Sequence, residues 1–325
     1  MTGHRIAVYY AWDRSREIAA PLDIIENRFP ALFESRRILY PHYEELADPD
    51  RFDQGIAGFL DEILRRNFQA FVEQAEAGTG HAVLEMERGG KDGATNRLDI
   101  GMLEGADTLI VISFDSLRTG QQADSGEVEA VRAFLAKPGN MLFICPHHDI
   151  GDVEDAPPHD RTGIQTEQFL HHGDRTIPPQ QRFGGFARSL LSGLGLPVEN
   201  RFGLHPASEP DGSPSPIEIE RARDRHGLLD GVATFNLHPH LPHFERRGEA
   251  LDGLDVLARQ PIDPAAPAHR FTRDGRSTFD ALLQSRPGLF AGDLLIGDAT
   301  LWSSTAGGLD SLRRFWRNVV SRGIG

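Results

Sequence analysis

Histidine, whose imidazole binds transition metals and transfers protons near neutral pH, is concentrated in two stretches of this sequence. Residues 147–172 and 238–243 together hold 8 of the 14 histidines of the chain. A divalent ion bound by these side chains would polarise a carbonyl group and generate hydroxide near neutral pH. The pattern therefore predicts a metal site, with zinc, iron or manganese as the expected ion.

The spacing of the histidines indicates which of them can share one ion. Adjacent side chains in 147–149 point in different directions on an extended chain, so one or two of them can face a single metal. Residues two apart project to the same side, so the two histidines of His238-Pro-His240 are expected to bind one ion together. The predicted metal ligands are His147, His148, His238 and His240.

The alternative for both stretches is a solvated loop or a surface turn. No standard zinc spacing such as H-E-x-x-H is present. His243 would reach the same ion only if the chain bends back at Pro242.

Acid–base or nucleophilic chemistry is a second possibility. The candidate catalytic residues are Cys145, Asp149, Asp115 and His240. Cys145 would act as a thiolate activated by a nearby histidine, and the carboxylates would act as general bases. Alternatively, Cys145 is a buried residue that ends a core strand, and the aspartates cap strand ends or turns.

The elements that must position these residues alternate between strand and helix. Apolar and β-branched runs predict strands, and three- and four-residue apolar spacing predicts helices. The predicted strands are 5–12, 37–40, 81–86, 107–113, 140–145, 198–203, 217–221, 232–237, 254–258 and 289–296. The predicted helices are 53–77, 126–136, 180–194 and 309–320, and 146–179 is predicted to be a long His-rich loop.

Strand and helix in alternation predict a mainly parallel sheet with right-handed crossovers, followed by antiparallel additions near the C-terminus. Ligands of such sheets bind beyond the carboxyl ends of the strands. That rule selects Asp13, Asp115, residues 145–149, residues 238–243 and Asp298.

Five stretches resemble the class I glutamine amidotransferase-like superfamily: 107–113, 125–135, 138–149, 225–232 and 295–302. The resemblance implies a flavodoxin-like α/β fold with helices on both faces of the sheet. Since the sequence shows no internal repeat and no strong domain boundary, we expect a single domain over 1–325. It places Cys145 at the family's nucleophile position, but Phe143 and His147 stand where glycines would flank it. His238-Pro-His240 partly matches the family's His-x-Glu without the Glu, so the resemblance does not imply glutamine hydrolysis.

Charge and composition exclude several classes of partner. The 325 residues carry 34 Lys and Arg against 48 Asp and Glu, a net charge of −14, which argues against nucleic acid or an anionic membrane as the partner. The single cysteine excludes an internal disulfide, and neither a signal peptide nor an apolar run long enough to span a bilayer is visible. We expect a cytoplasmic protein, with a homodimer as the default assembly.

We predict a hydrolase that acts on an amide or other C–N bond of a small polar molecule, through a His/Asp site whose histidines orient a metal or transfer protons. A ligand- or partner-binding protein without catalysis is the alternative. A thiol-dependent enzyme that uses Cys145 is the third possibility.

Overall fold

The computed structural model describes residues 4–18, 65–90, 94–175 and 179–322. The predicted strand 37–40 and the part of the predicted helix 53–77 that precedes residue 65 lie outside these ranges. Within the described residues, none of the helices is both long and apolar enough to cross a lipid bilayer.

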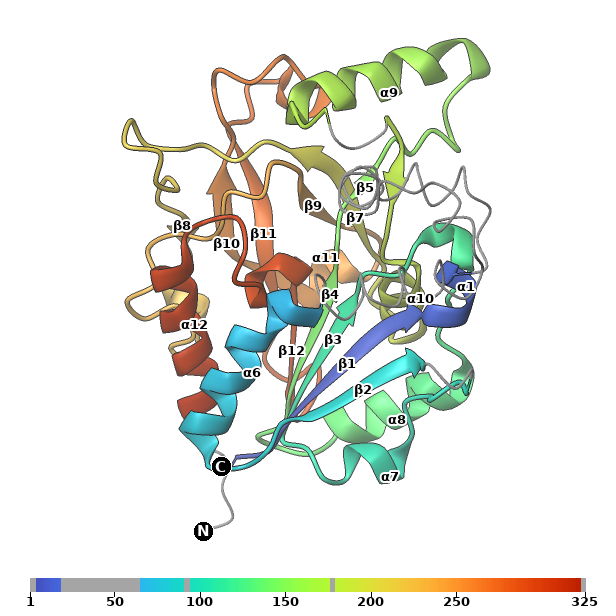
Figure 1. The fold of residues 1–325 in the computed structure, drawn as a ribbon, viewed down its shortest axis with the longest axis vertical. Helices are drawn as coiled ribbons and strands as arrows, with labels where there is room; N and C mark the ends of the chain where they lie inside the picture. The colour runs from blue at the N-terminus through green and yellow to red at the C-terminus, as the bar shows by residue number, and fades with distance from the viewer. Residues whose placement is uncertain (1–3, 19–64, 91–93, 176–178, 323–325) are drawn as a thin grey trace, which may run out of the picture.

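A large, mostly parallel sheet forms the centre of the fold (Figure 1). Its strands, in order across the sheet, are β2 (Leu84–Gly89), β1 (Ile6–Asp13), β3 (Thr108–Ser113), β4 (Met141–Pro146), β12 (Asp293–Gly297), β11 (Thr278–Ser285), β10 (Leu254–Pro261) and β8 (Glu218–Ile219). The strands from β2 to β12 run parallel, and β11, β10 and β8 add antiparallel pairs. The expected mainly parallel α/β sheet with antiparallel additions is thus confirmed.

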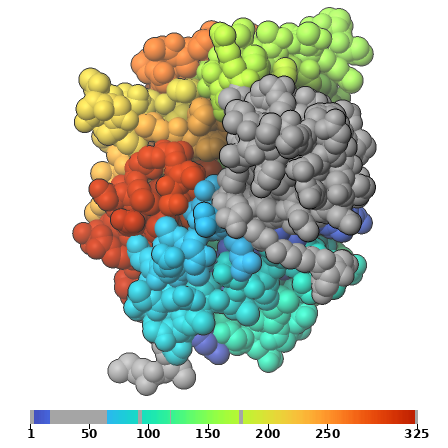
Figure 2. Space-filling model, in the orientation of Figure 1, coloured from blue at the N-terminus to red at the C-terminus, as the bar shows by residue number. Residues whose placement is uncertain are grey.

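Helices cover both faces of this sheet because its central strands are apolar on both sides. One face carries α6 (Arg66–Thr79) and α12 (Leu309–Ser321), which Figure 2 shows side by side on the outside of the molecule. The other carries α7 (Ile100–Leu103), α8 (Ser125–Leu135) and α10 (Gly185–Gly193). In β4, Phe143 and Cys145 join the first core, while Leu142 and Ile144 join the second.

A smaller antiparallel sheet follows the carboxyl end of β4. Its strands, in order, are β6 (Gln181–Arg182), β5 (Asp149–Ile150), β7 (Val198–Leu204) and β9 (Leu241–Arg246). The remaining short elements are α1 (Arg14–Ile18), α11 (Ala250–Gly253), η2 (Leu117–Thr119), η3 (Arg221–Arg223), η4 (Arg270–Thr272) and η5 (Ala299–Trp302).

The prediction of a long loop over 146–179 was wrong. The segment contains β5 and the helix α9 (Pro158–His172), which lies at the top of Figure 1. Proline fits the first turn of a helix, and Gly173 ends this one in the left-handed conformation with φ 73°. The buried residues Ile164, Gln168, His171 and His172 fall on one side of the helix at helical spacing.

The predicted strand over 232–237 was also wrong, because the backbone of this segment bonds to helix and loop instead of a sheet. Ser311 Oγ of α12 accepts the N–H groups of Ala233 and Thr234, each at 3.0 Å. The Leu237 N–H donates to the Ala306 carbonyl. The segment therefore runs along the α12 side of the fold before it enters β9.

Candidate metal centre

Three of the predicted ligands meet in space. His147, His238 and His240 each offer one nitrogen, and these three atoms lie within 4.8 Å of one another. His147 follows the end of β4, and His238 and His240 immediately precede β9. His240 packs closely against Gly203 of β7, where an added Cβ would lie 2.9 Å from the Cβ of His240. His147 and His240 are buried, whereas part of His238 is exposed.

Carboxylates stand behind two of the three imidazoles. His147 Nδ1 lies 2.9 Å from Asp298 Oδ1, and His240 Nε2 lies 3.4 Å from Asp174 Oδ2. Such carboxylates fix the orientation of a metal-binding histidine and raise its basicity. The pairing leaves Nε2 of His147 and the buried Nδ1 of His240 to face an ion.

Thr300 connects the two segments that carry the three histidines. Its backbone N–H and its hydroxyl donate to Asp298 Oδ2, and its hydroxyl also accepts a hydrogen bond of 2.9 Å from Asn236 Nδ2. Asn236 Oδ1 in turn accepts the N–H of His238 at 3.0 Å. This residue, Thr300, therefore links the carboxylate behind His147 to the backbone of His238.

Burial keeps His238 and His240 in their neutral form. Loss of hydration lowers the pKa of His240, and lowers that of His148 and His238 well below the ordinary value. The same cause lowers the pKa of His172 to about 3. The neutral imidazole is the form that binds metals, so His238 and His240 need not lose a proton to accept an ion.

His148, the fourth predicted ligand, lies beside the group but outside it. Its ring centre is 4.1 Å from that of His147 and 4.4 Å from that of His240. The three nitrogens that lie within 4.8 Å of one another nevertheless belong to His147, His238 and His240. His148 is fully buried, and neither of its ring nitrogens has a partner among the described residues.

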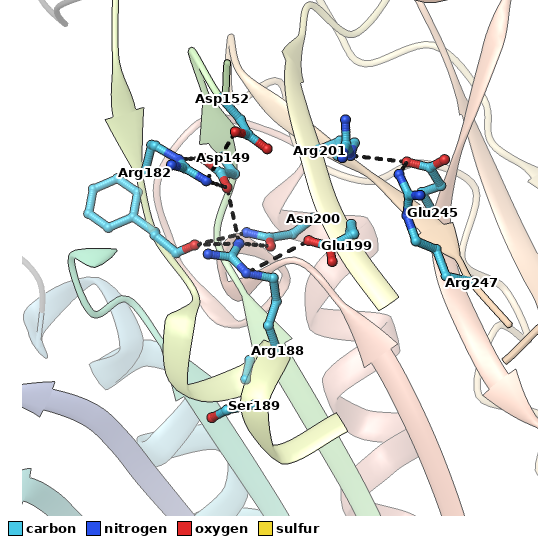
Figure 3. Close-up of polar contacts among 12 residues, drawn as sticks. Asp149, Asp152, Arg182, Arg188, Ser189, Glu199, Asn200, Arg201, Glu245 and Arg247 are labelled. Atoms are coloured by element: carbon cyan, nitrogen blue, oxygen red, sulfur yellow. Dashed lines mark hydrogen bonds and ion pairs between the residues drawn. The ribbon is translucent and has the colours of Figure 1, made fainter. Parts of the chain in front are cut away.

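Asp149, predicted as a base, belongs to an ion-pair network in the smaller sheet. Its carboxylate accepts from Arg182 Nε at 2.6 Å and from Arg188 Nη1 at 3.2 Å (Figure 3). Burial raises its pKa, and the two guanidinium groups act against that shift. This arrangement occupies the carboxylate with structural partners.

Asp115, the second predicted base, supports the start of α10. Its carboxylate accepts the N–H of Phe186 at 3.0 Å and the hydroxyl of Ser113 at 2.5 Å. Ser113 Oγ accepts the N–H of Ala187 at 3.0 Å. Asp115 is thus placed as a helix cap rather than at the histidine group.

Cys145, the predicted nucleophile, lies on β4 and is fully buried in the core that β4 forms with α6 and α12. The indole of Trp302 donates to its sulfur at 3.1 Å. Burial raises the pKa of the thiol, which opposes formation of a thiolate. This environment matches the alternative of a core residue.

His243 turns away from the centre. Its Nδ1 accepts the N–H of Asp280 in β11, and its ring faces Phe271. Sequence reasoning missed Asp174, which contacts His240, and Asn236, which accepts the backbone N–H of His238. Asp174 lies just after the end of α9. A sequence prediction of that helix would have drawn attention to Asp174.

No protein-family model matches this sequence, and no curated protein matches it either.

Proposed function

We propose that this protein is a metal-dependent hydrolase that acts on an amide or related C–N bond of a small polar molecule. The observation that carries the proposal is the convergence of His147, His238 and His240, with carboxylates behind two of them. Three protein ligands around zinc are typical of catalytic sites, because a fourth position remains for water or substrate. Structural zinc sites usually close that position with a fourth side chain.

Imidazole nitrogens suit zinc and iron better than manganese, so zinc is the proposed ion and iron the next choice. The ion would polarise the substrate carbonyl and supply hydroxide near neutral pH. Asp298 and Asp174 would hold His147 and His240 in orientation and balance the charge of the ion. The part of His238 that remains exposed marks the side from which a small molecule would enter.

The α/β fold with its mostly parallel sheet supports the finer assignment to an amidotransferase-like, flavodoxin-like architecture, which we propose on the resemblance of its sequence stretches. The proposal differs from glutamine amidotransferases in its chemistry, because Cys145 is buried in the core. A single cysteine is consistent with a cytoplasmic location, which is part of the proposal.

Metal analysis of the purified, tag-free protein tests the proposal. We expect about one equivalent of zinc or iron per chain in the wild type, and far less in His147→Gln and His240→Gln. The matched control is His243→Gln, which removes a histidine three residues from His240 that faces β11. Its metal content should equal that of the wild type.

Activity is then measured as ammonia released from a panel of primary amides. Chelation should abolish turnover and zinc should restore it, except in the two ligand variants. A metal content that is the same in wild type and His147→Gln would contradict the proposal. Full metal binding with no turnover on any amide would identify a structural metal site instead.

A further inference from the structure

Two histidines that the metal centre does not use border His240. The ring centre of His148 lies 4.4 Å from that of His240, and the ring centre of His172 lies 5.6 Å from it. Both side chains are fully buried. Both nitrogens of His148 and Nε2 of His172 are without a hydrogen-bond partner in the described part of the chain.

The hydrogen bonds around His172 fix which of its nitrogens carries the proton. The backbone N–H of Asp174 donates to His172 Nδ1 at 3.0 Å, so Nδ1 is an acceptor. In a neutral imidazole the other nitrogen then carries the hydrogen, so Nε2 is a donor. His148, with neither nitrogen engaged, offers one donor and one acceptor. Together the two rings present two donors and one acceptor.

Buried polar groups without partners are rare and call for an explanation, because each one costs its full desolvation free energy. The adjacent His171 shows the usual outcome at the end of the same helix. Its Nδ1 donates to the Pro267 carbonyl at 2.6 Å, and its Nε2 accepts the N–H of His205. A bound group that supplies the missing partners would explain why His148 and His172 differ.

We infer that His148 and His172 form the substrate subsite beside the proposed metal centre, and that this subsite takes an uncharged carboxamide group. A carboxamide oxygen accepts the Nε2–H of His172, and a carboxamide N–H donates to the acceptor nitrogen of His148. A carboxylate would leave that nitrogen unpaired and would meet the carboxylate of Asp174, which lies 3.4 Å from His240 Nε2. The inference rests on the proposed function, since the carboxamide carries the C–N bond to be broken.

Binding of acetamide to the zinc-loaded protein, followed by ligand-observed NMR titration, tests this subsite. His148→Phe and His172→Phe keep a ring and remove its nitrogens. Each should raise the dissociation constant of acetamide about tenfold or more while the zinc content stays at wild-type level. His148→Gln keeps a donor and an acceptor and should restore most of the affinity.

The matched control is His269→Phe. His269 is also fully buried, its Nε2 also has no partner among the described residues, and its ring packs against His171 and Phe202. It should bind acetamide like the wild type.

Three outcomes overturn the inference. Unchanged acetamide affinity in His148→Phe and His172→Phe would make these rings packing residues. Loss of zinc from His148→Phe would make His148 a metal ligand. An equal loss of affinity in His269→Phe would point to a general effect of burial. Acetamide binding that needs both rings in a protein that binds no metal would support the subsite and contradict the proposed function alone.

Discussion

Replacing Asn200 by aspartate should weaken metal binding without changing any metal ligand. Asn200 lies on β7 and is 1% exposed. Its side-chain amide donates to the backbone carbonyl of His147 and, at 3.1 Å, to that of Phe183. Its Oδ1 accepts from Arg188, which also binds Asp149 (Figure 3). Asn200 therefore holds the main chain from which the His147 ring projects.

The size of the effect follows from these contacts. Aspartate has nearly the same shape as asparagine but cannot donate, so both bonds to carbonyl oxygens become oxygen–oxygen contacts. Two lost hydrogen bonds are expected to lower the free energy of unfolding of the metal-free protein by about 2 kcal/mol. Displacement of the His147 carbonyl also shifts its ring, and disturbing the support of a ligand typically costs about 10- to 100-fold in metal affinity. We expect a rise of that size in the dissociation constant of zinc.

The assay is competition for zinc against a chromophoric chelator. Glu245→Gln is the control, because Glu245 of β9 pairs with Arg201 of β7 at 3.1 Å on the same two strands (Figure 3). Ion pairs as exposed as this one contribute about 0–1 kcal/mol, so zinc affinity should stay within about twofold of wild type. If Asn200→Asp loses stability but binds zinc like the control, the network supports the sheet and not the ligand.

Three further predictions concern residues outside the metal centre. Cys145→Ala should keep its metal and lose about 1–2 kcal/mol of unfolding free energy in urea, because the Trp302 indole loses its acceptor. Asp115→Ala should lose about 1–2 kcal/mol in the same assay through the weakened start of α10, with unchanged metal content. Burial lowers the pKa of His269 to about 3, below the 6.5 of the unfolded chain, so the unfolded state binds more protons and stability falls on acidification below pH 6.5. Urea unfolding at pH 6.5 and 5.5 should show His269→Gln losing about 1 kcal/mol less than wild type over this interval.

The sequence predicts the central layer of the fold well because its signals are local. The continuous apolar runs that became β3 and β4 and the periodic apolar residues of α12 need no knowledge of partners. Elements whose stability depends on tertiary contacts were misread. Val232 and Phe235 are buried, so their segment resembles a strand, yet α12 supplies the backbone partners that a sheet would have supplied.

The grouping of the histidines was predictable where residue spacing alone decides to which side of the chain a side chain points. His238 and His240 are two residues apart, and the structure brings their ring centres to 4.1 Å. His147 and His148 are adjacent, and the sequence did not show which of them joins His238 and His240. Asn200 comes 53 residues after His147, and the contact between them exists only because β7 pairs with β5, so no local pattern could reveal it.

Both segments that carry the three histidines lie where the chain passes into the smaller sheet, so this sheet positions the imidazoles. Residues 147–148 connect β4 to β5, and residues 238–240 lead into β9. The backbone bonds of the sheets leave the His147 carbonyl and the His238 N–H to side chains, and Asn200 and Asn236 bond to them. The two large cores form around other residues, and none of the three histidines belongs to them.

Unlike a zinc finger, whose fold depends on its metal, this chain should fold first and bind its ion afterwards. Loss of metal from His147→Gln would then report on coordination itself, because the scaffold that presents the other two imidazoles stays in place.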